Sequence, residues 1–333
     1  MLKIAAKQID VLNIGLMLIS LLVAIYLPFK LFLFSYAILG PLHYLTEINW
    51  LNEKGFFTQN KKKWILPLVV ASAILGSYGL LKLSTWNLPS NLTEIVNWVE
   101  AQYSTFILTA FFFAVALVFF KSWQKLSLAL IFSFIISYAL QNSIPKGFIL
   151  IGIFVPTIIH VYLFTGLFML WGARKSKSKF GLLAVIALLI IPVIIYAIPI
   201  SETAYKFDDG IIQNFLTSSM GSVNHKLAQL FALKGNESFV LLSELGIRIQ
   251  IFIAFAYTYH YLNWFSKTSI IGWQDSLKGK KVFLILVIWF AAVILYFTDF
   301  KLGFMALFFL SLLHVFLEFP LNVITIKDLF KRF

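Results

Sequence analysis

The chain contains no cysteine, and only 12% of its 333 residues are charged. Without cysteine there are no disulfide bonds, thiolate metal ligands or cysteine nucleophiles, so any metal must be bound through nitrogen and oxygen atoms. Globular proteins average about 25% charged residues, whereas hydrophobic residues make up 60% of this chain. This composition predicts an integral membrane protein.

Long apolar runs dominate the chain, and each is long enough to cross about 30 Å of hydrocarbon as an α-helix. Strands of a membrane barrel would instead alternate with a period of two. We therefore predict an all-α, polytopic bundle of about ten transmembrane helices, forming a single domain over residues 1–333. The predicted spans cover residues 10–29, 31–51, 64–83, 104–120, 124–141, 147–171, 181–199, 243–264, 281–298 and 302–324.

The net charge of +13 is spread over short loops and is not gathered on one soluble domain. This distribution does not indicate nucleic-acid binding. Most of the 27 basic residues fall in alternate loops, which by the positive-inside rule predicts that both termini are cytoplasmic. The first apolar run lacks a small-residue cleavage site after it, so it is expected to be a retained span and not a signal peptide.

Residues 200–240 form the only sizeable polar insert, and we expect it on the outer side of the membrane. The apolar residues between Ile211 and Leu233 recur with helical spacing. The sequence therefore predicts a helix that lies on the membrane surface or caps the bundle.

Four of the five histidines fall within predicted spans. His43, His160, His260 and His314 lie in the second, sixth, eighth and tenth spans, which all run in the same direction. At about 1.5 Å per residue from the predicted outer ends, they fall within roughly 8 Å of one another in depth. The sequence thus predicts a layer of four imidazoles inside the bilayer. His225, in the insert, is expected to be a solvated surface residue.

Two of these histidines are followed four residues later by a carboxylate, Glu47 after His43 and Glu318 after His314. Residues four apart share a helix face. Charged carboxylates at membrane depth cost several kcal/mol unless they are neutralised, and a divalent cation neutralises them. We therefore predict a metal site formed by the four histidines, with Glu47 and Glu318 as ligands or orienting groups. A hydrogen-bonded cluster that handles protons and simple structural burial are the alternatives.

Imidazole and carboxylate ligands without sulfur are compatible with non-haem iron and with zinc. Iron is favoured because a substrate inside the bilayer is a lipid or isoprenoid, whose C–H and C=C bonds call for oxidative chemistry more often than hydrolysis. Tyr259, beside His260, is a candidate catalytic residue that would donate a hydrogen bond; the alternative is membership of an interfacial aromatic belt. Pro41 and Pro156 precede His43 and His160 and predict kinks there.

The stretch Gly40-Pro41-Leu42-His43 followed by Glu47 resembles the Gly-x-Pro-His-Gly-x-x-Asp signature of the bacterial Brp/Blh-type β-carotene 15,15′-dioxygenases. In this chain Leu42 separates the proline from His43, Tyr44 replaces the second glycine and Glu47 replaces the aspartate. The resemblance implies a polytopic oxygenase of the bacterial inner membrane, with iron bound by the membrane histidines and a carotenoid substrate.

The leading hypothesis is a membrane-embedded, non-haem iron oxygenase or related oxidative enzyme acting on a hydrophobic carotenoid, isoprenoid or lipid that enters from the bilayer. A transporter that relays protons or a metal through the same cluster is the first alternative. A haem protein with two histidines as axial ligands is the second. A rhodopsin is disfavoured, because no lysine lies in the middle of a span where a retinal Schiff base could form.

Overall fold

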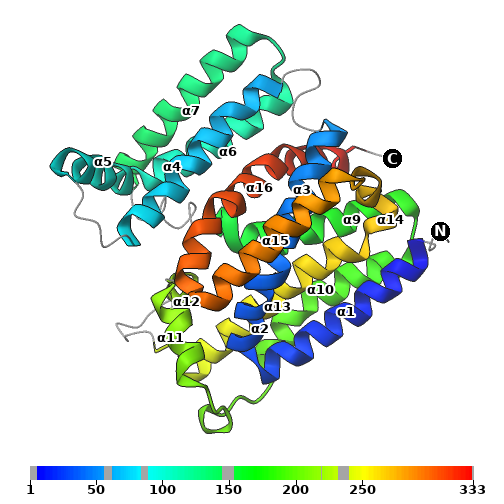
Figure 1. Cartoon of the computed structure of the whole chain (residues 1–333). Coiled ribbons are helices and arrows are strands. Elements are labelled where there is room, and N and C mark those ends of the chain that lie inside the picture. Colours follow the sequence, from blue (N-terminus) through cyan, green and yellow to red (C-terminus); the bar gives the residue numbers. More distant parts are fainter. Residues whose placement is uncertain are drawn as a thin grey trace. The chain divides into compact units, whose positions relative to one another are not determined.

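The computed structural model of the chain describes residues 6–55, 62–83, 89–144, 154–218, 220–231 and 240–331. Every regular element within these ranges is a helix, and no strand occurs among them. The predicted all-α fold is therefore confirmed (Figure 1). The beginning of the predicted span 147–171 and the end of the predicted helix Ile211–Leu233 lie outside the described residues.

Eight of the described helical segments are long and apolar enough to cross a membrane. They are Lys7–Tyr26, Pro28–Lys54, Lys63–Leu81, Trp123–Ser143, Val155–Ser176, Lys179–Ala197, Lys280–Thr298 and Phe300–Leu329. A ninth span results if α5 (Ser90–Ala101) and α6 (Tyr103–Phe119), which meet at 58°, count together. The chain is thus a multi-pass membrane protein, with eight or nine candidate spans where the sequence predicted about ten.

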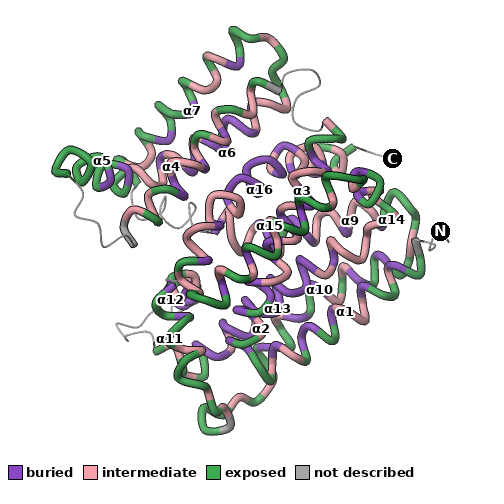
Figure 2. The backbone as a smooth tube through the Cα atoms, in the orientation of Figure 1, coloured by how far each residue is buried: buried purple, intermediate pink, exposed green. Residues whose placement is uncertain are grey.

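The difference lies in the predicted span 243–264, which corresponds to helix α13 (Glu244–Ser266). Gln250, His260 and Asn263 are among its residues, and such polar groups lower its hydropathy below that of the other spans. Most of its side chains are nevertheless buried within the protein (Figure 2). A helix covered by protein needs no lipid-compatible surface, because its polar groups find partners on neighbouring helices.

The chain divides into two compact units, of which the first comprises residues 1–43 and 157–275. Helix α13 is its centre and packs against α1, α2, α10, α12 and the short π-helix η1. The bounds are α1 Ala6–Tyr26, α2 Pro28–Phe34, η1 Ser35–Leu39, α9 Thr165–Ser176, α10 Lys179–Ala197, α11 Asp209–Thr217 and α12 Gly221–Phe231. A hydrogen bond of 2.8 Å between the hydroxyl groups of Ser35 and Thr258 joins η1 to α13.

The second unit comprises residues 44–156 and 276–333. Its long helix α16 (Phe300–Leu329) packs against α4 (Leu66–Leu83), α6 and α15 (Lys280–Thr298). Helix α7 (Trp123–Ser143) packs against α6, and the three helices α4, α6 and α7 run side by side in Figure 1. The boundary between the units falls within helix α3 (Gly40–Lys54), after His43.

Small residues allow α4 to approach α16 closely. A Cβ atom on Gly76 would lie 2.8 Å from Cβ and 3.0 Å from Cα of Phe309, and one on Gly79 would lie 2.8 Å from Sδ of Met305. Membrane helices associate largely by such close packing, because lipid gives no hydrophobic driving force between them.

Replacing Gly76 with valine is expected to destabilise the protein by about 1–3 kcal/mol, because the clash involves the Phe309 backbone, which cannot rotate away. Thermal unfolding in detergent would measure the effect. Gly15→Val is the matched control, since a Cβ atom there meets nothing within 4 Å. Equal melting temperatures for the two variants would contradict close packing at Gly76.

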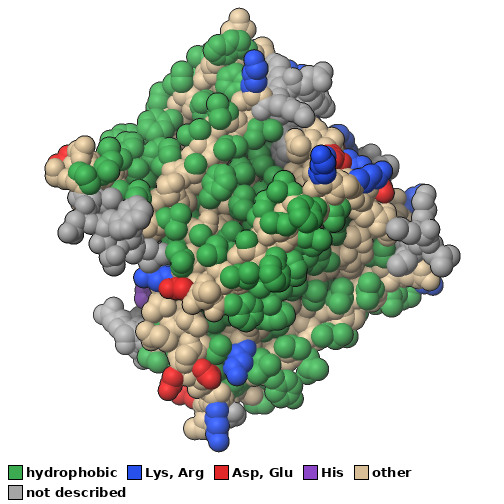
Figure 3. Space-filling model, in the orientation of Figure 1, with side chains coloured by type: hydrophobic (Ala, Val, Ile, Leu, Met, Phe, Trp, Pro, Cys, Tyr) green, Lys and Arg blue, Asp and Glu red, His purple; other side chains and the backbone are tan. Residues whose placement is uncertain are grey.

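Apolar side chains cover much of the visible protein surface (Figure 3). On α15, Phe283, Phe290 and Phe297 are 71%, 61% and 75% exposed. In water such a surface would drive aggregation. A bilayer accommodates it, which agrees with the membrane assignment.

Candidate metal centre

Two histidines of the first unit lie within or just after an irregular helix. His160 lies within the π-helix η3 (Val155–Phe164), and His43 follows closely after the π-helix η1. Prolines lie at both places, Pro156 within η3 and Pro41 after η1, and proline cannot donate the backbone hydrogen bond of a regular helix. π-Helical turns thus lie beside both prolines, and such turns are frequent at functional sites. The kinks expected at these prolines remain predictions.

Thr165 fixes the tautomer of His260. The Thr165 hydroxyl group donates to the backbone carbonyl of Val161 at 2.9 Å, and a hydroxyl group carries one proton only. Its oxygen also lies 2.8 Å from Nδ1 of His260, and with its own proton given to Val161 it would accept a hydrogen bond from a protonated Nδ1. His260 then carries its lone pair on Nε2. Proteins commonly orient a metal-binding histidine in this way, through its other ring nitrogen.

The Nε2 atom of His260 faces that of His43 at 3.1 Å. Two nitrogens bound to one tetrahedral ion at about 2.0–2.1 Å would be roughly 3.3 Å apart. The spacing therefore suits two ligands of a single ion. It does not suit a haem between these two rings, because axial nitrogens on opposite faces of one iron would lie about 4 Å apart.

The ring of His160 also contacts His260. The two ring centroids are 4.9 Å apart, and those of His43 and His260 are 4.6 Å apart. All three rings are buried, with exposed fractions of 1% for His43, 2% for His160 and 7% for His260. The first unit alone thus places three imidazoles around one point inside the protein.

His314 completes the group. One nitrogen from each of His43, His160, His260 and His314 lies within 4.8 Å of every other, and all four residues are buried. Two nitrogens on opposite sides of one ion would be about 4.2 Å apart, so the group is close to the size of a ligand shell. The predicted layer of four histidines is confirmed, and its residues could hold a metal ion.

Two carboxyl groups lie in the second unit with His314. Glu47 and Glu318 are both 3% exposed. Two buried negative charges repel each other strongly where the dielectric constant is low. A nearby cation would relieve this repulsion, which fits a metal site. The prediction that these carboxylates bind or orient the metal remains a prediction.

Several aromatic residues near the histidines were not singled out from the sequence. Tyr44 stacks on His314 with ring centroids 5.7 Å apart. Tyr261 and Trp264 pack against His43 at 5.2 and 5.5 Å. In the sequence, Tyr261 and Trp264 follow His260 by one and four residues. This spacing is only weak evidence for a contact, because α13 carries many aromatic residues.

The hydroxyl group of Tyr259 lies 3.5 Å from Oδ1 of Asn13 and 3.3 Å from Sδ of Met169. Asn13 lies on α1 and Met169 on α9, both in the first unit. The catalytic role of Tyr259 remains a prediction. His225 is exposed on α12, with Nε2 2.9 Å from the amide nitrogen of Gln229.

Thr165→Val is expected to weaken metal binding by roughly 10- to 100-fold, because His260 loses the acceptor that holds its ring and tautomer. Thr165→Ser keeps the hydroxyl group and should bind almost as tightly as the original protein. Competition with a chromophoric chelator would give both affinities. Equal affinities for the valine and serine variants would show that this hydrogen bond does not support metal binding.

Comparison with known proteins gives no match to a family model, to a curated protein or to a solved structure. The assignment of a function therefore depends on the geometry of the site.

Proposed function

We propose that the four-histidine cluster binds a transition metal, and that the chain is a membrane-embedded, non-haem iron oxygenase or related oxidative enzyme. The observation that carries this proposal is the convergence of four buried imidazole nitrogens within 4.8 Å. A single buried histidine commonly serves only to hydrogen-bond a neighbouring helix. Burying four imidazoles together costs free energy, because each is a polar group. A shared metal ion would offset this cost best.

Iron is the metal that we propose, with zinc as the alternative. Imidazole ligands suit both metals, and the chain offers no sulfur ligand. Bound iron would supply oxygen activation for a substrate that reaches the site from the bilayer. A carotenoid, isoprenoid or other lipid fits this position. The chain's resemblance to the Brp/Blh-type dioxygenases and a place in the bacterial inner membrane belong to the same proposal.

The residues of the chain have distinct tasks in this function. His43, His160, His260 and His314 hold the metal, and Thr165 keeps Nε2 of His260 unprotonated for that purpose. Glu47 and Glu318 balance the charge of the ion or orient a ligand. Tyr259 would act as a hydrogen-bond donor. The apolar surroundings exclude water, which keeps reactive oxygen species away from the solvent.

The carboxyl pair favours a second candidate, a proton- or metal-coupled transporter. Buried carboxylates and histidines inside a membrane commonly form proton relays. Uptake of protons or of divalent metal into proteoliposomes would identify a transporter. His160→Ala should abolish that uptake, and its persistence would contradict this candidate.

Metal analysis of detergent-purified protein tests the main proposal. After expression in cells replete with iron and zinc, we expect about one equivalent of metal per chain, predominantly iron. Oxygen consumption, together with mass spectrometry of products from carotenoid and isoprenoid substrates, then tests the oxidative activity. Less than about a tenth of an equivalent of any transition metal would contradict the metal site and the enzyme with it.

A further inference from the structure

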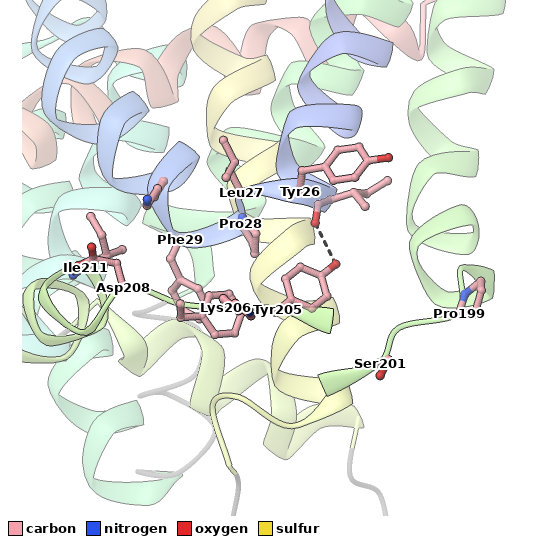
Figure 4. A pocket seen from close by; sticks show the side chains of 13 residues that line it. Tyr26, Leu27, Pro28, Phe29, Pro199, Ser201, Tyr205, Lys206, Asp208 and Ile211 are labelled. Atoms are coloured by element: carbon pink, nitrogen blue, oxygen red, sulfur yellow. Dashed lines mark hydrogen bonds between the residues drawn. The ribbon is translucent and has the colours of Figure 1, made fainter. Parts of the chain in front are cut away.

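A second site lies in the first unit, at the ends of several membrane spans. It is a pocket of about 330 Å³ lined by the junction between α1 and α2 and by the loop after α10. In Figure 4 this loop carries Ser201, Tyr205 and Asp208 past the junction at Leu27 and Pro28. The Tyr205 hydroxyl group donates to the backbone carbonyl of Ile25 at 2.9 Å and ties the two walls together.

The position of the pocket places it at the depth of lipid headgroups. One candidate span ends at Tyr26, the next begins at Pro28, and a third ends at Ala197, two residues before the lining residue Pro199. Tyr26, which is 71% exposed, and Tyr205 are the residue type that gathers at the membrane interface. Part of the lining is apolar and includes Ile25, Leu27 and Phe29.

The charges of the pocket favour an anion. Lys30 and Lys206 line it, and neither ammonium group has an ion pair or hydrogen bond within the described ranges of the chain. The acidic lining residue, Asp208, accepts the backbone N–H of Ile211 as the N-cap of α11, so the lining carries one negative charge against the two positive charges of the lysines.

Arg248, the nearby third cation, is engaged. Its guanidinium group pairs with Glu244 at 2.7 Å and donates to the backbone carbonyl of Ile195 at 2.6 Å. The two lysines are therefore the groups available to a ligand.

We propose that this pocket binds the phosphate headgroup of an anionic membrane lipid. The two ammonium groups would contact the phosphate, while the acyl chains would follow the apolar wall into the bilayer. Basic residues near a membrane surface attract anionic lipid headgroups, and the apolar lining residues suit the start of the acyl chains. The site is independent of the histidine cluster and of the function proposed for it.

Native mass spectrometry of the detergent-solubilised protein, titrated with phosphatidylglycerol, tests the proposal. Lys30→Gln combined with Lys206→Gln should weaken binding by about fivefold for each lysine, or roughly 25-fold for the pair. Ser201→Trp, which fills the pocket and keeps both lysines, should also weaken it. Lys226→Gln combined with Lys301→Gln removes two charges elsewhere and should leave binding unchanged.

Three results would overturn the proposal. If the Lys30/Lys206 double variant bound phosphatidylglycerol as tightly as the original protein, the two lysines would not be part of the binding site. An equal loss in the Lys226/Lys301 control would show general attraction to a positive surface. Displacement of phosphatidylglycerol by an equal concentration of inorganic phosphate would identify free phosphate, and not a lipid, as the ligand.

Discussion

His260→Ala is expected to lower the bound metal from about one equivalent per chain to less than about a tenth. His260 contacts both His43 and His160, and its Nε2 atom is held with its lone pair available by the hydrogen bond to Thr165. Its removal therefore deletes one proposed ligand and the residue that contacts two other histidines of the group. Metal analysis after purification and dialysis measures the loss directly.

The matched control is His225→Ala. His225 is exposed and bonded to Gln229, so its removal should leave the metal content unchanged. Thermal unfolding of both variants shows whether each still folds. His43→Ala provides a second variant in case His260→Ala fails to fold. Retention of a full equivalent of metal by both folded His260 and His43 variants would show that the cluster does not bind the metal.

The common depth of the histidines could be predicted from sequence, because depth in a membrane follows from residue count. Each span crosses a slab of nearly fixed thickness, so His43, His160, His260 and His314 could be placed in one layer without knowing how the helices pack. Lateral packing was not needed for that prediction. The number of spans differs between sequence and structure because of α13. This helix is buried among other helices, and its polar residues lower the hydropathy from which spans are identified.

The details around the ligands could not be predicted in the same way. The hydrogen bond from His260 to Thr165 joins residues 95 positions apart. Thr165 directly follows the π-helix η3. A π-helical turn contains more residues than an α-helical turn, so the direction of the Thr165 side chain differs from that expected for a regular helix. Apolar periodicity cannot reveal such a shift when every face of the helix is apolar. The contacts of Tyr44 and Tyr261 with the histidines could not be predicted for a related reason, because the chain contains 13 tyrosines and 36 phenylalanines.

Removing the metal with a chelator is expected to lower the melting temperature by roughly 3–5 °C. A ligand at a hundred times its Kd stabilises the folded state by about 2.7 kcal/mol, and each kcal/mol shifts the melting temperature by about 1–2 °C in a chain of 333 residues. The three histidines of the first unit lie on α3, η3 and α13, so a shared ion links segments that are far apart in the sequence.

The chelator effect separates a metal site from a purely hydrogen-bonded cluster. In a hydrogen-bonded cluster, imidazole pairs such as His43 and His260 would satisfy each other, and the chelator would leave the melting temperature unchanged. In a metal site, adding iron back restores the original value, whereas His260→Ala responds to neither treatment. Metal analysis must first show that the chelator has removed the metal. If the melting temperature then stays the same, coordination does not hold these helices together, and the hydrogen-bonded cluster is favoured.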